Sequence, residues 1–218
     1  DGVDSDDNGN SADGRNPTLT PVDEGTQTRA VAKTLGVTSE ADSADNNVLI
    51  GEVLTYQLKV NVPPGTTRQL VLVDTLPEGL AYVAGSGRLS RTFTTGLTAS
   101  VNPAGINSAA SGDFVNLSNP WSGHDLRLSL GDVINSDTDS ASYTLEYKAV
   151  VQNVAGNTTG EKLTNTGGIR YWNALSQTQT TNATPVTVTV IQPLLTLTKT
   201  PSPSALLNES LGSFVYTF

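Results

Sequence analysis

Residues 53–62 read Val53-Leu54-Thr55-Tyr56-Gln57-Leu58-Lys59-Val60-Asn61-Val62, with a large apolar side chain at every even-numbered position. Successive side chains of a β-strand point to opposite faces. This period of two therefore predicts a strand with one face in a core and the other in water. Residues 143–151 and 186–190 alternate in the same way. These segments predict sheets that each bury one face.

The other apolar runs are also short and end at turn sequences such as Pro63-Pro64-Gly65 and Leu76-Pro77-Glu78-Gly79. No segment shows a helical period with caps. This many short strands predicts an all-β sandwich. Residues 96–125 are rich in small side chains and are either an insertion with short strands or a mobile flap. We expect strands at 28–35, 48–62, 68–76, 79–84, 88–95, 126–130, 141–152, 161–172 and 184–192.

The composition argues against several classes of function. The 218 residues carry a net charge of −9 with only 12 Lys and Arg, whereas nucleic acids and anionic membranes attract basic surfaces. No apolar run reaches the roughly 18 residues that a transmembrane helix needs. Cysteine is absent, so no disulfide stabilises the fold. An acidic chain rich in Thr, Asn and Gly favours an exported bacterial protein, with this sequence starting after any targeting segment.

The opening pattern of the chain occurs twice. A strand with Lys33 is followed by a polar loop and a strand that runs from Gly51 through Tyr56. Residues 195–218 repeat this order with Lys199, Gly212 and Tyr216. Repetition of this kind is typical of modular arrays.

The repeat suggests three parts. Residues 1–27 form an acidic linker that is a candidate for calcium binding, and residues 28–192 form one module. Residues 193–218 are either the opening strands of a following repeat or strands donated to a neighbouring subunit. Strand donation would assemble the chains head to tail into a filament.

Three sequence elements resemble a known family. They are Ile50-Gly51-Glu52-Val53-Leu54-Thr55-Tyr56, the segment from Val73 to Val83 with Asp-Thr-Leu-Pro-Glu-Gly, and Leu163-Thr164-Asn165-Thr166. Together they resemble the DUF11-type repeat, which is related to the isopeptide-forming D2 domain of Gram-positive pilins and adhesins. The resemblance implies an Ig-like β-sandwich from a large bacterial or archaeal surface protein.

The resemblance also implies an intramolecular isopeptide bond between Lys33 and Asn165. Amide formation needs a neutral amine, a carboxamide beside it and a protonated acid that polarises the carbonyl group. Burial lowers the pKa of a lysine and raises that of a carboxyl, so an apolar core favours both states. Asp74 or Glu146 is the candidate acid. In the alternative interpretation, Lys33 is a solvated lysine at a strand end and Asp74 caps the turn before Pro77.

A candidate calcium site lies near the start of the chain. Residues 4–9 read Asp-Ser-Asp-Asp-Asn-Gly, where alternate oxygens can converge on one cation and Gly permits a sharp turn. The candidate ligands are Asp4, Asp6, Asn8 and Asp13. The twelfth position is Arg15 instead of Glu, so the segment is no EF-hand. The alternative interpretation is a solvated acidic linker.

We expect no catalytic site. His124 is the single histidine, and no Gly-x-Ser-x-Gly nucleophile motif accompanies it. One histidine without cysteine also argues against zinc. Four aromatic residues can either form a sugar-binding platform or fill the core: Trp121, Trp172, Tyr171 and Tyr82.

The sequence therefore favours a structural repeat module of an extracellular cell-surface stalk, adhesin or filament. Its expected partners are neighbouring modules or identical subunits, with no nucleic acid and no membrane insertion in this segment. Calcium is the possible cofactor. The alternative is a carbohydrate- or protein-binding module of a secreted protein.

Overall fold

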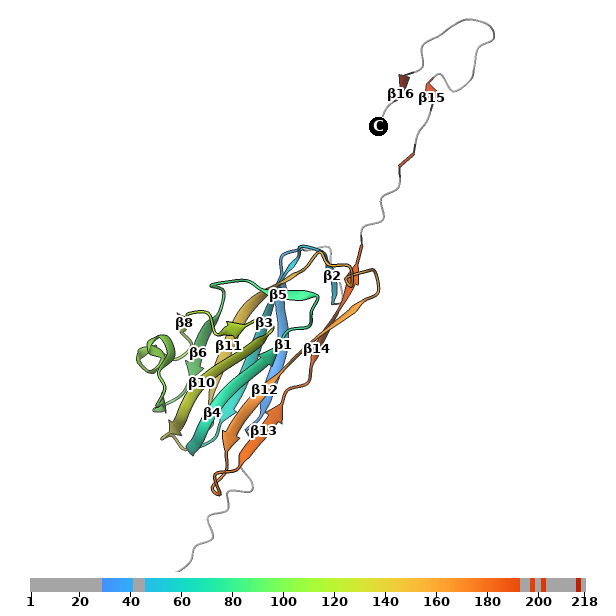
Figure 1. Ribbon diagram of the computed structural model, residues 1–218. Helices are drawn as coiled ribbons and strands as arrows, with labels where there is room; N and C mark the ends of the chain where they lie inside the picture. Colours follow the sequence, from blue (N-terminus) through green and yellow to red (C-terminus); the bar gives the residue numbers. More distant parts are fainter. Residues whose placement is uncertain (1–28, 41–45, 193–196, 199–200, 203–214, 217–218) are drawn as a thin grey trace, which may run out of the picture.

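The computed structural model describes residues 29–40, 46–192, 197–198, 201–202 and 215–216. Two β-sheets face each other and enclose a core, which confirms the expected all-β, Ig-like sandwich (Figure 1). No helix in the described part of the chain is long and apolar enough to cross a membrane.

The first sheet is antiparallel. The order across it is β1 (Val31–Thr38), β3 (Val53–Val62), β11 (Ala141–Val151), β6 (Arg88–Thr92) and β8 (Phe114–Asn116), with β5 at Leu80–Tyr82. Strand β11 lies at the centre, pairs with β3 and β6, and also pairs with the short β5.

The second sheet is antiparallel except where β14 pairs with β2. Strand β13 (Thr178–Asn182) adds to β12, and β9 (Trp121–Ser122) adds to β10. The order across the sheet is β2 (Asn47–Leu49), β14 (Val186–Ile191), β12 (Lys162–Trp172), β4 (Gly65–Thr75), β10 (Asp125–Asn135) and β7 (Leu97–Ala99).

The core follows the alternation of the sequence. On β3, Leu54, Tyr56 and Leu58 are fully buried, while the side chains between them are partly exposed. The inward residues of β11 are buried beside them, since the two strands pair with Tyr147 opposite Tyr56. Leu70 and Leu72 of β4 close the core from the second sheet. The prediction of one buried face per sheet is confirmed.

The expectation of a single strand at 48–62 is wrong. A turn at Ile50–Glu52 separates β2 from β3 and sends them into different sheets. Gly51 has a φ of 90°, which L-residues with a side chain rarely adopt. The Glu52 carboxylate accepts a hydrogen bond of 2.8 Å from the Leu49 backbone amide. The Ile-Gly-Glu motif is therefore the point where the chain changes sheet.

Residues 96–125 form an insertion with short strands, one of the two expected alternatives. It contains β7, a 3₁₀ segment (Pro103–Ser108), β8 and β9. The buried Arg91 guanidinium donates hydrogen bonds to the carbonyl groups of Leu97, Asn107 and Ala109. One side chain of the first sheet thus anchors β7 and the 3₁₀ segment of this insertion.

Beyond the sandwich, β15 (Pro201–Ser202) pairs antiparallel with β16 (Val215–Tyr216). The pair aligns Pro201 with Tyr216, and in the sandwich β1 and β3 align Leu35 with Tyr56. Pro201 follows Lys199 by the same two positions that separate Leu35 from Lys33. The register of this short ladder therefore matches the register of the first two long strands of the module.

We predict that Tyr143→Phe reduces the loss of stability at alkaline pH. Burial raises the pKa of Tyr143 to about 12 from an ordinary value of 10.0. A raised folded-state pKa gives stability that is complete below pH 10 and is lost as the pH rises toward 12. The loss amounts to about 2–3 kcal/mol in the free energy of unfolding.

Urea unfolding at a series of pH values from 7 to 12 measures this slope. At pH 7 the variant should match the parent within about 1 kcal/mol, because the Tyr143 hydroxyl has no hydrogen-bond partner among the described residues. Equal alkaline slopes for parent and variant would contradict the prediction.

Candidate functional site: a buried lysine between the sheets

Four polar side chains from four strands meet in the core. Lys33 of β1 and Tyr147 of β11 come from the first sheet, and Asp74 of β4 and Asn165 of β12 come from the second. The side chains of Lys33 and Asp74 are fully buried, as are Tyr147 and Asn165. We call these residues the Lys33 cluster. It lies between the two sheets, where the strands carrying it alternate apolar-in and polar-out.

Tyr147 is the centre of the hydrogen bonds in the Lys33 cluster. Its hydroxyl oxygen accepts from Lys33 Nζ at 3.1 Å and from Asn165 Nδ2 at 2.7 Å. The same hydroxyl donates to Asp74 Oδ1 at 2.9 Å. Lys33 Nζ also contacts Asp74 Oδ2 directly. The amine and the carboxamide are thus both within hydrogen-bonding distance of one oxygen atom.

Gly167 provides the space for the lysine and the aspartate. It pairs with Asp74 across β12 and β4. A Cβ atom at Gly167 would lie 3.0 Å from Asp74 Oδ2 and 3.2 Å from Lys33 Nζ, closer than ordinary van der Waals contacts. Any side chain at this position would push the two groups of the pair away.

Burial changes the proton affinities in the Lys33 cluster. It lowers the pKa of Lys33 and raises the pKa of Asp74, and in each case the opposite charge of the partner acts against the shift. Burial also raises the pKa of Tyr147 well above its ordinary value. These directions favour a neutral amine, a protonated carboxyl group and an intact phenol, because a core of low polarity disfavours every charged form.

Aromatic rings enclose the amine. Lys33 Nζ lies 5.4 Å from the ring centroid of Tyr56 and 5.5 Å from that of Tyr147. The two rings stack with centroids 5.7 Å apart, and Trp121 meets Tyr147 edge-on at 4.9 Å. The amine therefore has no contact with solvent.

Asn165 has one unusual feature. Its Oδ1 atom is buried and has no hydrogen-bond partner in the described part of the chain. Leaving a buried acceptor unpaired costs about 1–3 kcal/mol, so such groups are rare without a reason.

The structure brings three of the four predicted isopeptide residues together and places the fourth elsewhere. Lys33, Asn165 and Asp74 meet, and the alternative of a solvated Lys33 is wrong because its side chain is fully buried. Glu146 was the other candidate acid, and it points away from this site. Its carboxylate accepts from Arg88 Nε at 2.7 Å and from Gln57 Nε2 at 2.8 Å. Glu146 is adjacent to Tyr147 on β11, so the two side chains face opposite sides of the sheet.

Sequence reasoning missed Tyr147 and Gly167 as members of the site. The inward direction of Tyr147 follows from the alternation of β11, which was visible in the sequence. The contacts of Tyr147 with residues of three other strands were not visible in the sequence, because these contacts depend on how the sheets face each other. Gly167 lies on the inward face of β12 with Asn165, two positions away, and an inward glycine in a strand is a signal of close approach.

The calcium candidates Asp4, Asp6, Asn8 and Asp13 lie outside the described residues. Within the described part of the chain no group of metal-ligating side chains occurs. His124 is exposed at the turn before β10 and joins no Ser–His–carboxylate set among the described residues. Its backbone carbonyl accepts from the Leu76 amide at 2.9 Å.

The four aromatic candidates divide into two groups. Trp121 and Tyr82 stack on each other at 5.3 Å beside Tyr147 and belong to the core. Tyr171 and Trp172 line a pocket of about 360 Å³ at the far end of β12. There Arg29 lies over the ring of Tyr171 at 4.5 Å and Arg68 over that of Trp172 at 5.8 Å. Guanidinium groups thus occupy the ring faces that a sugar would need.

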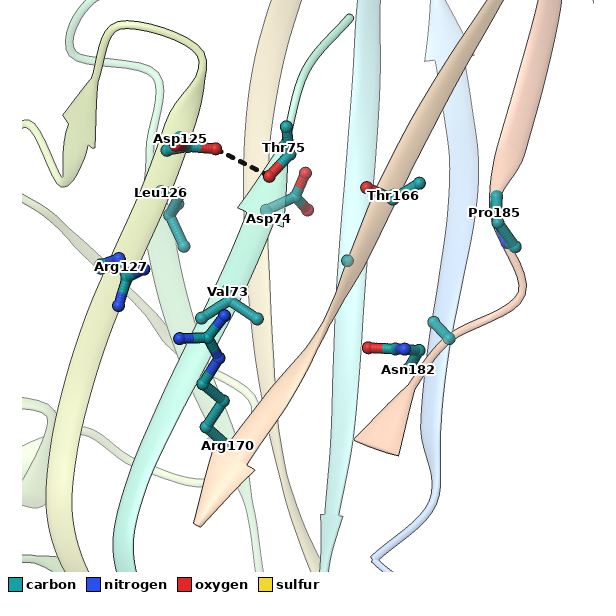
Figure 2. A pocket seen from close by; sticks show the side chains of 12 residues that line it. Val73, Asp74, Thr75, Asp125, Leu126, Arg127, Thr166, Arg170, Asn182 and Pro185 are labelled. Atoms are coloured by element: carbon teal, nitrogen blue, oxygen red, sulfur yellow. Dashed lines mark hydrogen bonds between the residues drawn. The ribbon is translucent and has the colours of Figure 1, made fainter. Parts of the chain in front are cut away.

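A larger pocket of about 660 Å³ lies over the outer face of the second sheet, between β10, β4 and β12 (Figure 2). Arg127 and Arg170 flank Val73 there, and Thr75 donates a hydrogen bond of 2.8 Å to Asp125. Asp74 borders this pocket through its strand. Its fully buried side chain points to the interior, so the pocket does not expose the Lys33 cluster to water.

Several solved structures have a similar fold. The collagen-binding domain of the Erysipelothrix rhusiopathiae surface protein RspB is 15% identical with a TM-score of 0.45, over 73% of this chain and 45% of that chain. The major pilin BcpA of Bacillus cereus is 13% identical with a TM-score of 0.46, over 80% and 42%. The pilus backbone protein RrgB of Streptococcus pneumoniae is 16% identical with a TM-score of 0.43, over 67% and 32%.

These neighbours are surface pilins and adhesins of Gram-positive bacteria, and the chain spans less than half the length of each. At these identities and TM-scores the likeness assigns no role to this chain. No protein-family model matches the chain, so the DUF11-type assignment is not confirmed. No curated protein matches it either.

We predict that Gly167→Ala disrupts the Lys33 cluster. The added methyl group would overlap both Lys33 Nζ and Asp74 Oδ2. Overpacking of this kind lowers the free energy of unfolding by about 1–3 kcal/mol. Urea unfolding measures the change, with Gly156→Ala as the control because a Cβ atom there meets nothing within 4 Å. Equal losses for both variants would contradict the geometry.

Proposed function

We propose that this chain is a structural module of an extracellular stalk, adhesin or filament, and that an isopeptide bond between Lys33 and Asn165 joins its two sheets. The Lys33 cluster is the observation that carries the proposal. A lysine amine, a carboxamide and an acid are sealed together in a dry core, and all three contact one hydroxyl group. If these positions only had to stabilise the core, well-packed hydrophobic residues in their place would make the fold at least as stable.

The reaction requires no external reactant. The lone pair of Lys33 Nζ adds to Cγ of Asn165, the bond from Cγ to Nδ2 breaks, and Nδ2 leaves as ammonia. The amine loses one proton and the leaving nitrogen gains one. Asp74 supplies the acid, since burial raises its pKa and so favours the protonated carboxyl group. Burial lowers the pKa of Lys33 and so favours the neutral amine that acts as the nucleophile.

The position of the bond suits a mechanical role. Within the sandwich the chain begins with β1 and ends with β14, and the bond would connect β1 to β12, the strand that pairs with β14. Tension applied at the two ends would pass through the bond, and the strands between Lys33 and Asn165 would carry little load. By analogy with disulfides that close loops of about 100 residues, the bond would add about 4–5 kcal/mol to stability.

An extracellular location fits this chemistry. The chain has no cysteine, and an amide crosslink stabilises it independently of the redox state outside the cell. The net charge of −9, with only 12 Lys and Arg residues, favours a solvated surface protein.

We predict that the intact mass of the purified chain is lower than the sequence mass by one ammonia. Proteolysis should release a branched peptide that joins the Lys33 and Asn165 segments. Asn165→Ala should restore the unmodified mass because it lacks the carboxamide, and Asp74→Asn should lose ammonia more slowly than the parent because it lacks the acid. High-resolution mass spectrometry of all three proteins checks this.

Glu146→Gln is the matched control. It removes a carboxylate next to Tyr147 in sequence that points toward Arg88 instead of the amine, so it should keep the loss of ammonia. An unmodified mass for the parent chain would refute the bond. Loss of the bond in Glu146→Gln alone, with Asp74→Asn unaffected, would refute the assignment of the acid.

The segment after the sandwich supports a role in a longer assembly. Its β15–β16 ladder has the register of β1 and β3, so β15 and β16 correspond to the opening strands of the module. Opening strands cannot bury an apolar face without further strands. We propose that they add to a neighbouring subunit and assemble the chains head to tail.

We predict that the chain forms concentration-dependent oligomers, and that truncation after Gln192 leaves monomers. Sedimentation velocity over a range of concentrations distinguishes the two proteins. The truncated chain retains every strand of the sandwich, so its circular dichroism should be unchanged. If the full chain is also monomeric, strand donation between chains is wrong.

A further inference from the structure

We propose that Tyr147 is a catalytic residue of the bond-forming reaction, and that its hydroxyl group passes a proton from Asp74 to the leaving nitrogen of Asn165. This inference rests on the isopeptide bond proposed above. The geometry points to it because Asp74 Oδ1, the Tyr147 hydroxyl and Asn165 Nδ2 form one chain of hydrogen bonds of 2.9 and 2.7 Å.

Asp74 needs an intermediary to reach the leaving group. The hydrogen bonds of its carboxylate within the cluster go to Lys33 through Oδ2 and to Tyr147 through Oδ1. The Asn165 nitrogen donates to Tyr147. Tyr147 is therefore the group that contacts both the acid and the nitrogen that must gain a proton. It also contacts the attacking amine at 3.1 Å, so it touches both reacting nitrogens.

The direction of the hydrogen bonds reverses during the reaction. In the intact carboxamide the Nδ2 lone pair is delocalised, so this nitrogen donates to Tyr147. When Lys33 Nζ adds to Cγ, Nδ2 becomes tetrahedral and its lone pair becomes available. The nitrogen then accepts a proton from the Tyr147 hydroxyl, which in turn accepts one from protonated Asp74 Oδ1.

The proton transfers form a cycle that restores Asp74 and Tyr147. As Asp74 gives the proton on Oδ1 to Tyr147, its Oδ2 takes a proton from Lys33 Nζ, with which it is in direct contact. One proton leaves the amine, one reaches the leaving nitrogen, and both Asp74 and Tyr147 end in their starting protonation states. The bond from Cγ to Nδ2 breaks and ammonia departs. No ionised phenol forms, which agrees with the raised pKa of the buried Tyr147.

Tyr147→Phe tests the relay, because it removes the hydroxyl and keeps the ring that stacks on Tyr56. General acid–base groups contribute about 10²–10⁴-fold to a rate, so the variant should lose ammonia at least about 100-fold more slowly than the parent. Each chain is produced in inclusion bodies, dissolved in urea and refolded. The intact mass is then followed with time.

Tyr143→Phe is the matched control. Tyr143 lies on the same face of β11, is fully buried, and has a hydroxyl without a partner in the described part of the chain. The Tyr143→Phe variant should form the bond at the parent rate. The unfolding curve of Tyr147→Phe should match that of Asn165→Ala, which folds without the bond. A match shows that the ring still supports the fold.

The double variant Tyr147→Phe with Asp74→Asn separates a relay from simple positioning. If Tyr147 acts by passing the proton of Asp74, the double variant should be no slower than the slower single variant. If Tyr147 only positions Asn165, the two rate losses should multiply, and the relay is then wrong.

A second measurement needs no variant at position 147. The refolding parent chain should form the bond more slowly in D₂O than in H₂O, since protons move along the relay in the slow step. Equal rates in the two solvents, or a parent rate for Tyr147→Phe, would overturn the relay and leave the bond intact. A parent chain that never loses ammonia would overturn both proposals.

Discussion

The contact between Lys33 and Asp74 in the core is the interaction on which the rest of the structure depends. It joins the two sheets, since the lysine comes from β1 and the aspartate from β4. A buried charge without a partner is costly, and removing one member of such a pair typically costs about 3–5 kcal/mol. The pair therefore fixes how the sheets face each other, and the surrounding rings and Gly167 are arranged to fit it.

Burial also changes the proton affinities of the pair. Desolvation lowers the pKa of Lys33 and raises that of Asp74, which favours a neutral amine beside a protonated carboxyl group. Tyr147 links them to Asn165, whose carbonyl oxygen has no partner among the described residues.

The role proposed for the module follows from where the chain places this chemistry. Lys33 is on the first strand, and Asn165 is on the strand that pairs with the last one of the sandwich. The proposed covalent link there would protect the segment between them from extension. The short ladder of β15 and β16 repeats the register of β1 and β3, which agrees with a chain built from successive units.

The sequence by itself determined the strands and their inward faces, because a period of two specifies which side chains meet the core wherever the strands lie. Through the resemblance to isopeptide-forming domains, it also indicated Lys33, Asp74 and Asn165. It could not choose between Asp74 and Glu146 as the acid, nor find Tyr147 and Gly167. Those choices depend on the register between β12 and β4 and on the facing of two sheets, which join residues far apart in the chain. Only the tertiary structure decides which of the buried polar groups share one hydroxyl oxygen.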